Sequence, residues 1–510
     1  MHPSEERLAD PRDLLAALLD LRAAVLAEGQ GLCAAWQPSL RRRAFLPGAV
    51  NLAHYLALRR RDLRPLQPAL QRWGLSSLGR GESRVAPLLD TVAATLGRLC
   101  DGAVTPPHPP ARRLLRGERL LAHNAAALFG PPQPGRATRI MVTLPPEAAN
   151  DAAFARALLA RGVECVRINC AHDTPEAWAA MLAHLRAAER EAGGDRRVRV
   201  LMDLGGPKLR TALMGDPKDQ PRVRVGDRLL LARGPAQPNT ALPQIGCAQP
   251  GIIEQLAVGA AVWIDDGKIG GRVAAIEADG ALLEITRAPQ RGKRLRPEKG
   301  LNFPDTALRV SPLTAKDRQD LDFVARHADL IGYSFVQAPA DVALLLDALA
   351  TGDAPARPDL GLVLKIETGR AVRQLPDLIV AAAGQMPTAV MIARGDLAVE
   401  VGFERLAEIQ EELLWLCEAA HLPVIWATQV LEQLAQEGTP ARGEVTDAAM
   451  GARAECVMLN KGPFILDTIT FLDDVLRRMP GHQQKKTPQL RALRSWEDLF
   501  AAEPTVAAHP

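Results

Sequence analysis

The 510-residue chain lacks the features of membrane, secreted and disulfide-rich proteins. No stretch approaches the ~18–20 apolar residues that a membrane-spanning helix needs. The N-terminus, MHPSEERLAD, is acidic and has no apolar segment of the kind found in secretory signals. The seven cysteines are scattered without a Cys-x-x-Cys pair, which favours buried thiols in a reducing compartment over disulfides or a zinc site. We therefore predict a cytoplasmic protein with no membrane partner.

A P-loop is also missing, because no Gly-x-x-x-x-Gly-Lys-Ser/Thr sequence occurs. Any phosphate site must therefore be built differently. The content of hydrophobic residues, 47%, and of charged residues, 24%, is ordinary for a globular protein. A chain of this length is expected to form two to four domains.

The N-terminal region differs in charge from the rest of the chain. Residues 1–135 hold 18 arginines, no lysine and 11 acidic residues, a net charge of +7, whereas the remainder carries −4. Apolar residues at three- and four-residue spacing predict helices in residues 10–29, 51–74 and 82–102. The region is predicted to be an α-helical domain.

Two arginine runs in this region, at residues 41–43 and 59–61, raise the question of nucleic-acid binding. The segment LQPALQRWGLSSLGR (residues 66–80) faintly resembles a helix-turn-helix. A solvated helix face or a docking surface for the next domain is the favoured interpretation, so no nucleic-acid partner is expected.

The pattern changes after a Pro/Gly-rich joint at residues 129–139. Eight short β-branched or apolar runs follow, most with an amphipathic helix behind them: RIMVTL, VECVRIN, VRVLMDL, DLIGYSF, LGLVLKIE, AVMIARGD, LPVIWATQ and ECVMLN. This alternation predicts an α/β protein with a (β/α)₈ TIM barrel. After the third strand, period-two alternation with Asp-Gly turns predicts a small all-β insertion that acts as a lid. The predicted parts are 1–135 (helical), 136–212 (barrel), 213–299 (lid), 300–480 (barrel) and 481–510 (tail).

Polar and charged residues gather where the predicted barrel strands end. They are Arg167, Asn169, Asp203, Ser334, Lys365, Glu367, Arg394, Asp396 and Thr428. Lys365 and Glu367 are two residues apart in one strand, so their side chains share a face. A lone Lys-x-Glu is most simply a structural ion pair, but ligands of barrel enzymes bind at the C-terminal strand ends. The accumulation there indicates a functional site.

The residue types at these strand ends point to a chemistry. Glu367 and Asp396 provide two carboxylates with no nearby His or Cys set, which suits a hard cation such as Mg²⁺. Lys365 and Arg167 supply positive charge for a phosphate or a developing enolate. The set favours phosphoryl transfer or enolate chemistry over covalent catalysis.

A series of short motifs resembles one family, the pyruvate kinases. They are VRINCAH, MDLGGPKLRT, WIDDGKI, KGLNFPD, LTAKDRQDLDF, SFVQ, KIET, MIARGDLAVE, PVIWATQVLEQL and PARGEVTD, in the family's order over residues 136–480. The resemblance implies a barrel with a β lid that transfers phosphate from phosphoenolpyruvate to ADP, giving pyruvate and ATP. It also implies Mg²⁺ or Mn²⁺ as cofactor.

The resemblance also implies roles for individual residues. Lys365, Arg167 and Thr428 would be catalytic, with Lys365 on the transferring phosphoryl group and Thr428 near the enolate's methylene carbon. Glu367 and Asp396 would hold the metal. The substrate would contact Asn169, Asp203, Ser334 and the backbone amides of Gly395 and Asp396, and the nucleotide would contact His172, Arg210, Lys299 and Asp266.

Several positions depart from the family pattern. Ala171 and Leu204 stand where potassium-dependent members have oxygen ligands, and Lys208 stands where they have glutamate. A lysine ammonium can substitute for a monovalent cation, so we predict that K⁺ is not required. Gln337, Gly205 and residues 460–463 also differ, which leaves the level of activity open.

No segment after residue 480 resembles the family's regulatory C-terminal domain. We therefore expect neither a fructose-bisphosphate site nor the tetramer interface of that domain, and a homo-oligomer such as a dimer is left open. Two alternatives to an active kinase also remain. One is a Mg²⁺-dependent enolate-forming barrel enzyme, such as an aldolase or lyase acting on a 2-oxo acid. The other is a catalytically impaired regulatory homologue.

Overall fold

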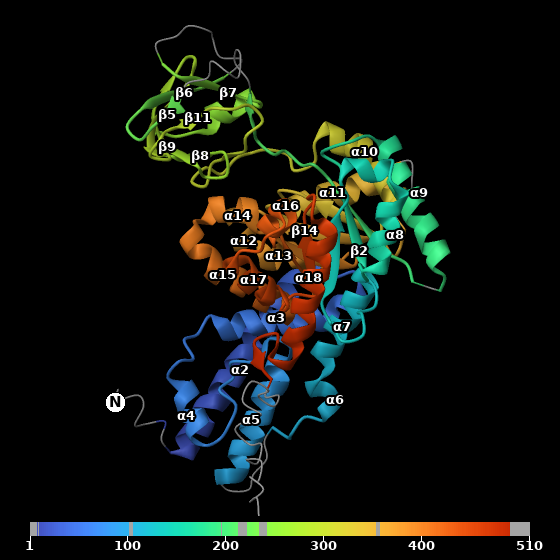
Figure 1. The fold of residues 1–510 in the computed structure, drawn as a ribbon. Coiled ribbons are helices and arrows are strands. Elements are labelled where there is room, and N and C mark those ends of the chain that lie inside the picture. Colours follow the sequence, from blue (N-terminus) through green and yellow to red (C-terminus); the bar gives the residue numbers. More distant parts are fainter. Residues whose placement is uncertain are drawn as a thin grey trace, which may run out of the picture.

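The computed structural model describes residues 8, 10–100, 106–194, 196–212, 222–233, 242–352 and 357–489. Figure 1 shows three parts stacked along one direction, with the N-terminal helices at one end, a β/α barrel in the middle and a β domain at the other end. Within these ranges, no helix is long and apolar enough to cross a membrane.

The centre of the molecule is a closed barrel of eight parallel strands in the order β1-β17-β16-β15-β14-β13-β3-β2. All eight predicted strands are confirmed, and the ends of each lie within three residues of the ends of its predicted run. They are β1 (Arg139–Thr143), β2 (Cys165–Asn169), β3 (Arg199–Asp203), β13 (Leu330–Tyr333), β14 (Gly361–Ile366), β15 (Thr388–Ala393), β16 (Val424–Ala427) and β17 (Cys456–Leu459). Their near-continuous burial reflects a sheet covered by helices outside and by side chains inside.

Helices surround the barrel and are started by local capping signals. Thr174 and Pro175 begin one helix, and a Thr314–Asp317 capping box begins another. The surrounding helices are α8 (Ala152–Ala160), α9 (Pro175–Ala192), α10 (Ala315–His327), α11 (Pro339–Thr351), α12 (Gly369–Arg373), α13 (Leu375–Ala383), α14 (Arg394–Val401), α15 (Phe403–Ala419), α16 (Glu432–Glu437), α17 (Arg442–Gly451) and α18 (Ile465–Arg478).

The insertion after β3 is an all-β lid, as predicted. Its main sheet has the order β12-β8-β9-β10-β6-β7-β4, and β5 pairs with β11. The strands are β4 (Thr211–Ala212), β5 (Arg222–Val223), β6 (Arg228–Ala232), β7 (Gln244–Cys247), β8 (Ala261–Ile264), β9 (Ile269–Glu277), β10 (Gly280–Arg287), β11 (Lys293–Arg294) and β12 (Leu301–Asn302). Both Asp-Gly turns occur, and Asp266 and Gly267 take the positive φ values of a tight hairpin.

The N-terminal region is helical, but one expectation about it was wrong. Residues 51–74 do not form one helix, because α3 ends at Arg59 and α4 begins only after Pro65. Residues 66–80 hold a single short helix followed by non-helical chain, so they are not a helix-turn-helix. The helices are α2 (Pro11–Trp36), α3 (Leu46–Arg59), α4 (Leu66–Arg72), α5 (Val85–Cys100), α6 (Ala111–Leu114) and α7 (Arg116–Phe129).

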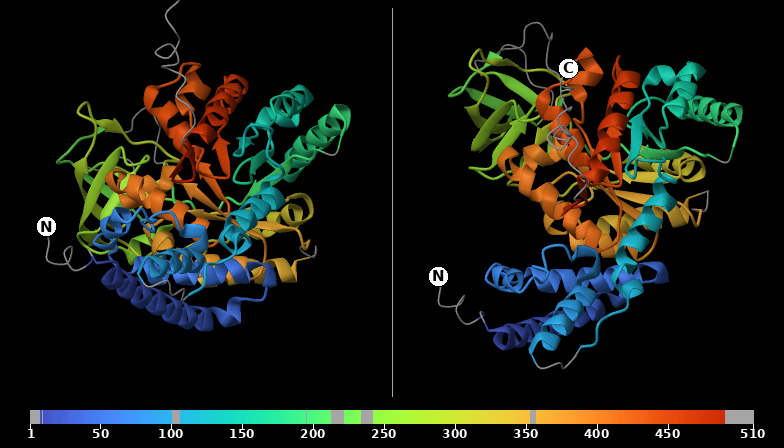
Figure 2. Two further views of the ribbon diagram at one scale, coloured as in Figure 1. Left: turned by 90° about the horizontal axis from the view of Figure 1, so that it is seen from below. Right: turned by 60° about the horizontal axis from the view of Figure 1, so that its bottom comes forward.

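The N-terminal region docks on the end of the barrel opposite the lid, as Figure 2 shows from below. At the end of α7, Leu128 and Phe129 join the apolar cluster inside the barrel. A Cβ atom at Gly361 would lie 2.5 Å from Leu128, so glycine at the start of β14 admits this plug. Asn51 donates its amide to the Ala419 carbonyl at 2.8 Å. The N-terminal region therefore packs directly against the barrel.

The first part of the predicted tail contacts both the barrel and the N-terminal region. A short hairpin of β18 (Gln483–Gln484) and β19 (Thr487–Pro488) places Lys485 against Glu455 of the barrel and Lys486 against Glu82 of the N-terminal region. Lys486 also lies 4.6 Å from the ring centre of Trp415. The expected packing of Leu490, Leu493 and Trp496 lies outside the described residues.

Candidate active site

Lys365 is the centre of the polar cluster at the C-terminal end of the barrel. On β14 the side chains of Val363 and Lys365 point into the barrel, whereas Leu362, Leu364 and Ile366 pack outward against the helices. The Lys365 Nζ lies 2.6 Å from Ser334 Oγ, 3.2 Å from Asp203 Oδ2 and 3.3 Å from Glu367 Oε1. The lysine and glutamate of this strand thus share one face, as predicted, and belong to a larger network.

Asp203 joins the two buried cations of this network. Its Oδ2 lies 2.6 Å from Arg167 Nη2, in addition to its contact with Lys365. Burial alone would raise the pKa of Asp203, but the nearby Lys365 and Arg167 outweigh it and hold that pKa below its usual value. Gly332 makes room for this carboxylate, because a Cβ atom there would lie 2.5 Å from Asp203 Oδ1.

Glu367 is buried, with 3% of its surface exposed, and each oxygen has a partner. Oε2 accepts a hydrogen bond from the backbone N–H of Phe335 at 2.7 Å. Phe335 holds a positive φ of 56°, a costly conformation that aims this N–H at the carboxylate. Burial raises the pKa of Glu367; Lys365 opposes this effect, and the charge of Asp396 adds to it.

Arg394 shapes the start of α14. Its guanidinium donates to the carbonyls of Ala427 and Thr428 at 3.0 and 2.7 Å, pairs with both oxygens of Asp447, and stacks on Trp426. This arrangement makes Arg394 a positioning residue, buried away from the cavity. The Gly395 N–H donates to Thr428 Oγ1 at 2.7 Å, which fixes the hydroxyl beside the helix N-terminus.

Lys208 contacts the second predicted metal ligand. Its Nζ lies 2.8 and 3.0 Å from the two oxygens of Asp396. No bond from Lys208 to Asn169 or Asp203 occurs among the described residues. Lys208, which stands where potassium-dependent members of the family have glutamate, therefore pairs with Asp396, one of the two predicted metal ligands.

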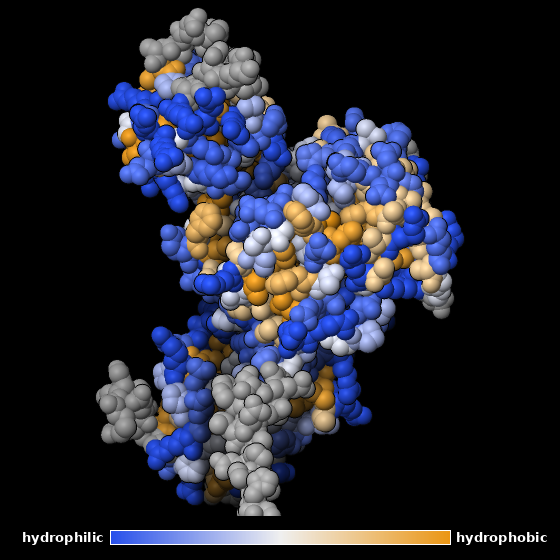
Figure 3. All heavy atoms as spheres, viewed as in Figure 1, coloured by the Kyte–Doolittle hydropathy of each residue, from blue (hydrophilic) through white to orange (hydrophobic). Residues whose placement is uncertain are grey.

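A cavity of about 350 Å³ opens above this network. Of the predicted site residues, it is lined by Arg167, Asn169, His172, Lys208, Arg210, Asp266, Ser334, Lys365, Glu367, Gly395, Asp396 and Thr428. Asp203 lies beneath the cavity floor. Lys299 does not line the cavity, and its ammonium lies 3.9 Å from Asp265 in the lid. Figure 3 shows a notch between lid and barrel on one face of the molecule.

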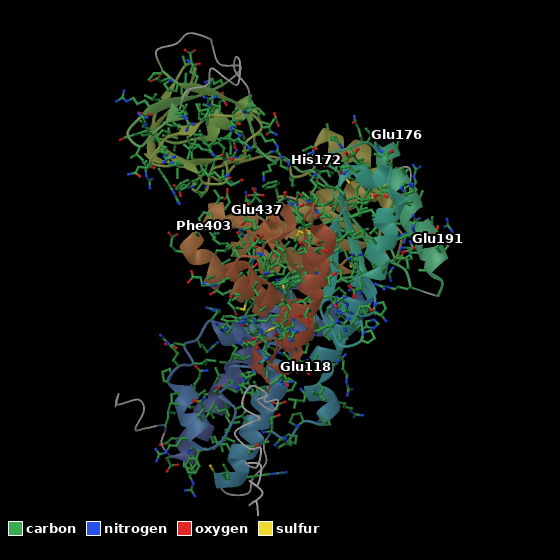
Figure 4. The ribbon with its side chains drawn as sticks, in the orientation of Figure 1. Glu118, His172, Glu176, Glu191, Phe403 and Glu437 are labelled. Atoms are coloured by element: carbon green, nitrogen blue, oxygen red, sulfur yellow. The ribbon has the colours of Figure 1, made fainter. Side chains whose placement is uncertain are left out.

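Sequence reasoning did not assign several residues that line this cavity, among them Gln429, Glu432, Asn460 and Lys461. Asn460 and Lys461 lie in the segment that departs from the family pattern, and this departure was the feature of the sequence that could have marked them as site residues. His172, labelled in Figure 4, lies at the barrel end that faces the lid. Burial lowers the pKa of His172, and Lys461 and Arg210 lower it further. Two cationic side chains, Lys461 and Arg210, therefore lie near His172 in this part of the cavity.

The carboxylates of Glu367 and Asp396 fit a hard divalent cation. They are oxygen donors from neighbouring strands, and their mutual repulsion raises the pKa of Glu367. The described residues contain no group of three or more His, Cys, Asp or Glu side chains that could hold a metal alone. Substrate and water oxygens must complete the coordination, as is usual for Mg²⁺.

The lid is attached to the barrel beside this site. Asn302, at the lid's exit, donates to Glu400 Oε1 of α14 at 3.1 Å. Burial raises the pKa of Glu400 to about 7; Asn302 lowers it, and Asp396 raises it. This contact links the lid to the helix that carries Asp396.

A closed (β/α)₈ barrel with cations and paired carboxylates at its strand ends, beneath a β lid, defines a phosphotransferase-type barrel enzyme. A family model described as "Pyruvate kinase, barrel domain" matches residues 135–463. The chain belongs to the pyruvate kinase family.

Similar proteins from several organisms carry the same name. Two proteins named "Pyruvate kinase" from Agrobacterium vitis are 32% identical over 356 residues and 31% identical over 391 residues. These alignments cover 68% and 74% of this chain, and 70% and 73% of those proteins. "Pyruvate kinase PKLR" from Rattus norvegicus is 29% identical over 359 residues, which are 68% of this chain and 60% of that protein.

Proposed function

We propose that the enzyme transfers the phosphoryl group of phosphoenolpyruvate to ADP and forms pyruvate and ATP. The observation that supports this most directly is the buried Lys365 ammonium, which lies among Asp203, Glu367 and Ser334 at the floor of the cavity. Phosphoryl transfer needs positive charge where the transferring group and the leaving oxygen develop negative charge.

Lys365 and Arg167 supply that charge. Burial lowers the pKa of Lys365, but the charges of Asp203 and Glu367 outweigh it, so the pKa is raised and the ammonium stays protonated at neutral pH. Arg167 is held by Asp203 through its Nε and Nη2 atoms. Both cations are thus positioned before substrate arrives, which reduces the reorganisation needed during the reaction.

The substrate carboxylate is proposed to bind the backbone amides at the start of α14. The positive end of the helix dipole favours an anion there. Thr428 Oγ1 accepts from Gly395 N–H and donates to the Ala427 carbonyl at 2.8 Å. Thr428 can pass a proton to the enolate's methylene carbon only after its O–H turns away from the Ala427 carbonyl, which takes a rotation about the Cβ–Oγ1 bond, and the hydroxyl then regains a proton from water.

Glu367 and Asp396 would hold Mg²⁺ or Mn²⁺. Such an ion supplies Lewis-acid stabilisation of phosphoryl and enolate oxygens when bound. Lys208 now occupies both oxygens of Asp396, and it must give up at least part of this contact for Asp396 to ligate a cation. The ammonium then remains beside the site as a monovalent charge, which supports the proposal that K⁺ is dispensable.

The nucleotide is proposed to bind in the part of the cavity that lies around His172. His172, Arg210 and Asp266 line this part together with Lys461. The lysine's carbonyl accepts a hydrogen bond from Gln436 at 2.8 Å, and Gly462 packs against Ala435, so the segment is held in place. We assign Lys461 to the nucleotide phosphates, because it lines the cavity together with His172 and Arg210 and its charge lies close enough to lower the pKa of His172.

A coupled assay with lactate dehydrogenase tests the proposal. Purified enzyme with phosphoenolpyruvate, ADP and Mg²⁺ should consume NADH, and Lys365→Met should abolish turnover while the circular dichroism spectrum is kept. Lys268→Met, at a largely exposed lysine of the lid, should leave the rate unchanged. Absence of turnover by the unaltered protein would contradict the proposal and would favour one of the alternative functions.

A further inference from the structure

A second cavity, of about 650 Å³, lies at the opposite end of the barrel from the active site. It is formed where the linker between α2 and α3 meets the ends of α11 and α13. Its lining residues are Arg41, Arg42, Leu346, Leu349, Ala350, Arg357, Pro358, Leu360, Gln385, Met386 and Pro387. Its volume lies in the range of ~300–1,000 Å³ that is usual for small-molecule sites.

Arg41 and Arg42 are fixed in this cavity by their backbones. Both N–H groups donate to the carbonyl of Gly384, at 3.0 and 2.7 Å. The Ser39 carbonyl accepts from Gln385 Nε2 at 3.1 Å and packs so closely that a Cβ atom at Gly384 would lie 2.2 Å away. The linker is therefore firmly attached to the end of α13.

The side chains of these two arginines have no carboxylate partner and no hydrogen bond within the part of the chain that the structure describes. Arg42 is partly buried, and this burial lowers its pKa. A guanidinium removed from water without a counter-ion costs free energy, which an anionic ligand would recover. An anionic ligand is thus the partner that these two arginine side chains favour, and the proposed reaction does not supply one at this end of the barrel.

Among the described residues that line the cavity, none is acidic. Arg357, the third cation of the cavity, donates to the Ala328 carbonyl at 2.8 Å and lies 3.5 Å from Asp329. Asp329 is already shared with Arg186, Arg197 and Arg199 at 3.4–3.6 Å. Arg357 also lies 3.5 Å from Asp359, so its charge is compensated from outside the cavity, whereas Arg41 and Arg42 add two further cations to the described lining.

One wall of the cavity is apolar. Its residues are Leu346, Leu349, Leu360, Met386 and Pro387. An inorganic anion would leave this wall unused, whereas a ligand with an apolar body would bury it. An apolar wall combined with two guanidinium groups that have no counter-ion in the described part of the chain selects an amphipathic anion.

We propose that this cavity binds a small organic phosphate, with the phosphate on Arg41 and Arg42 and the apolar body against Leu346, Leu349 and Met386. A phosphate monoester carries a charge of about −1.5 to −2 at pH 7, which matches two guanidinium groups. The cavity lies beside the N-terminal ends of β14 and β15, whereas Lys365 and Asp396 lie at the other ends of these strands. The ligand therefore does not compete with phosphoenolpyruvate.

Isothermal titration calorimetry with 1-naphthyl phosphate tests the proposal on the full-length protein. We expect 1-naphthyl phosphate to bind, and inorganic phosphate to bind at least tenfold more weakly. The double variant Arg41→Ala/Arg42→Ala should weaken 1-naphthyl phosphate binding at least tenfold, and the corresponding double lysine variant should recover part of it. Arg43→Ala is the matched control, because Arg43 is exposed and does not line the cavity.

The Lys365→Met variant separates this site from the active site and should bind the probe as the unaltered protein does. The proposal is overturned if the probe does not bind at millimolar concentration, or if binding is lost in Lys365→Met but kept in the double alanine variant. It is also overturned if Arg43→Ala weakens binding as much as the double variant, because the affinity would then reflect general surface charge.

Discussion

Replacing Glu400 by glutamine should make the protein more stable at alkaline pH. Burial raises the pKa of Glu400 to about 7 from a usual value of 4.5, with Asp396 and Asp305 adding repulsion and the donors Asn302 and Phe303 opposing it. An acid whose pKa is higher in the folded chain favours folding below its unfolded pKa. That advantage is lost as the pH rises toward the folded pKa.

The magnitude follows from the size of this shift. One pKa unit corresponds to about 1.4 kcal/mol, so ionising Glu400 in the folded protein costs about 3 kcal/mol at most, and about 2–3 kcal/mol once its partial exposure is considered. Relative to Glu400→Gln, the unaltered protein should lose this amount between pH about 4.5 and about 7. Below that window the two proteins should differ by a constant offset.

Urea denaturation followed by circular dichroism at pH 4.5, 6 and 8 measures this difference. EDTA should be present, because a cation at Asp396 would change the field at Glu400. Glu404→Gln, which replaces an exposed carboxylate at the start of α15, is the matched control. Parallel pH profiles for Glu400→Gln and the unaltered protein would refute the reasoning.

Three further predictions concern catalysis. Lys461→Ala should raise KM for ADP several-fold with little change in kcat, and an unchanged KM in initial-rate kinetics would remove Lys461 from the nucleotide site. Replacing K⁺ by Na⁺ or Tris in the assay buffer should leave the rate the same; strong activation by K⁺ would show that Lys208 does not substitute for the ion. Arg394→Lys loses the bidentate contact with Asp447 and the hydrogen bonds to the carbonyls of Ala427 and Thr428. It should therefore lower the free energy of unfolding, measured in urea, by about 2 kcal/mol and reduce kcat. Equal stability of the variant and the unaltered protein would contradict this.

The barrel and lid were predictable because their signals are local. Eight buried runs alternate with capped helices, and the lid has a period of two with Asp-Gly turns, so neither depends on distant contacts. The break between α3 and α4 was missed because apolar spacing continued across Pro65. The plug formed by Leu128 and Phe129 could not be predicted, because it depends on which end of the barrel α7 meets.

The sequence predicts the part of the site that is formed by residues at the ends of the barrel strands. Lys365, Glu367 and Asp203 converge because parallel strands of a closed barrel finish at the same rim. The pairing of Lys208 with Asp396, and the place of Lys299 outside the cavity, depend on how the lid chain returns to the barrel. Side-chain periodicity carries no information about that path.

We propose that the buried Lys365 ammonium at the end of β14 stabilises the phosphoryl group that passes from phosphoenolpyruvate to ADP, beside a divalent cation that Glu367 and Asp396 would hold. The most direct measurement is the phosphoenolpyruvate-dependent rate of pyruvate formation with ADP, with Mg²⁺ and with EDTA, for the unaltered protein and for Lys365→Met. The account predicts turnover only for the unaltered protein with Mg²⁺. Equal rates for Lys365→Met, or a rate that EDTA leaves unchanged, would contradict it.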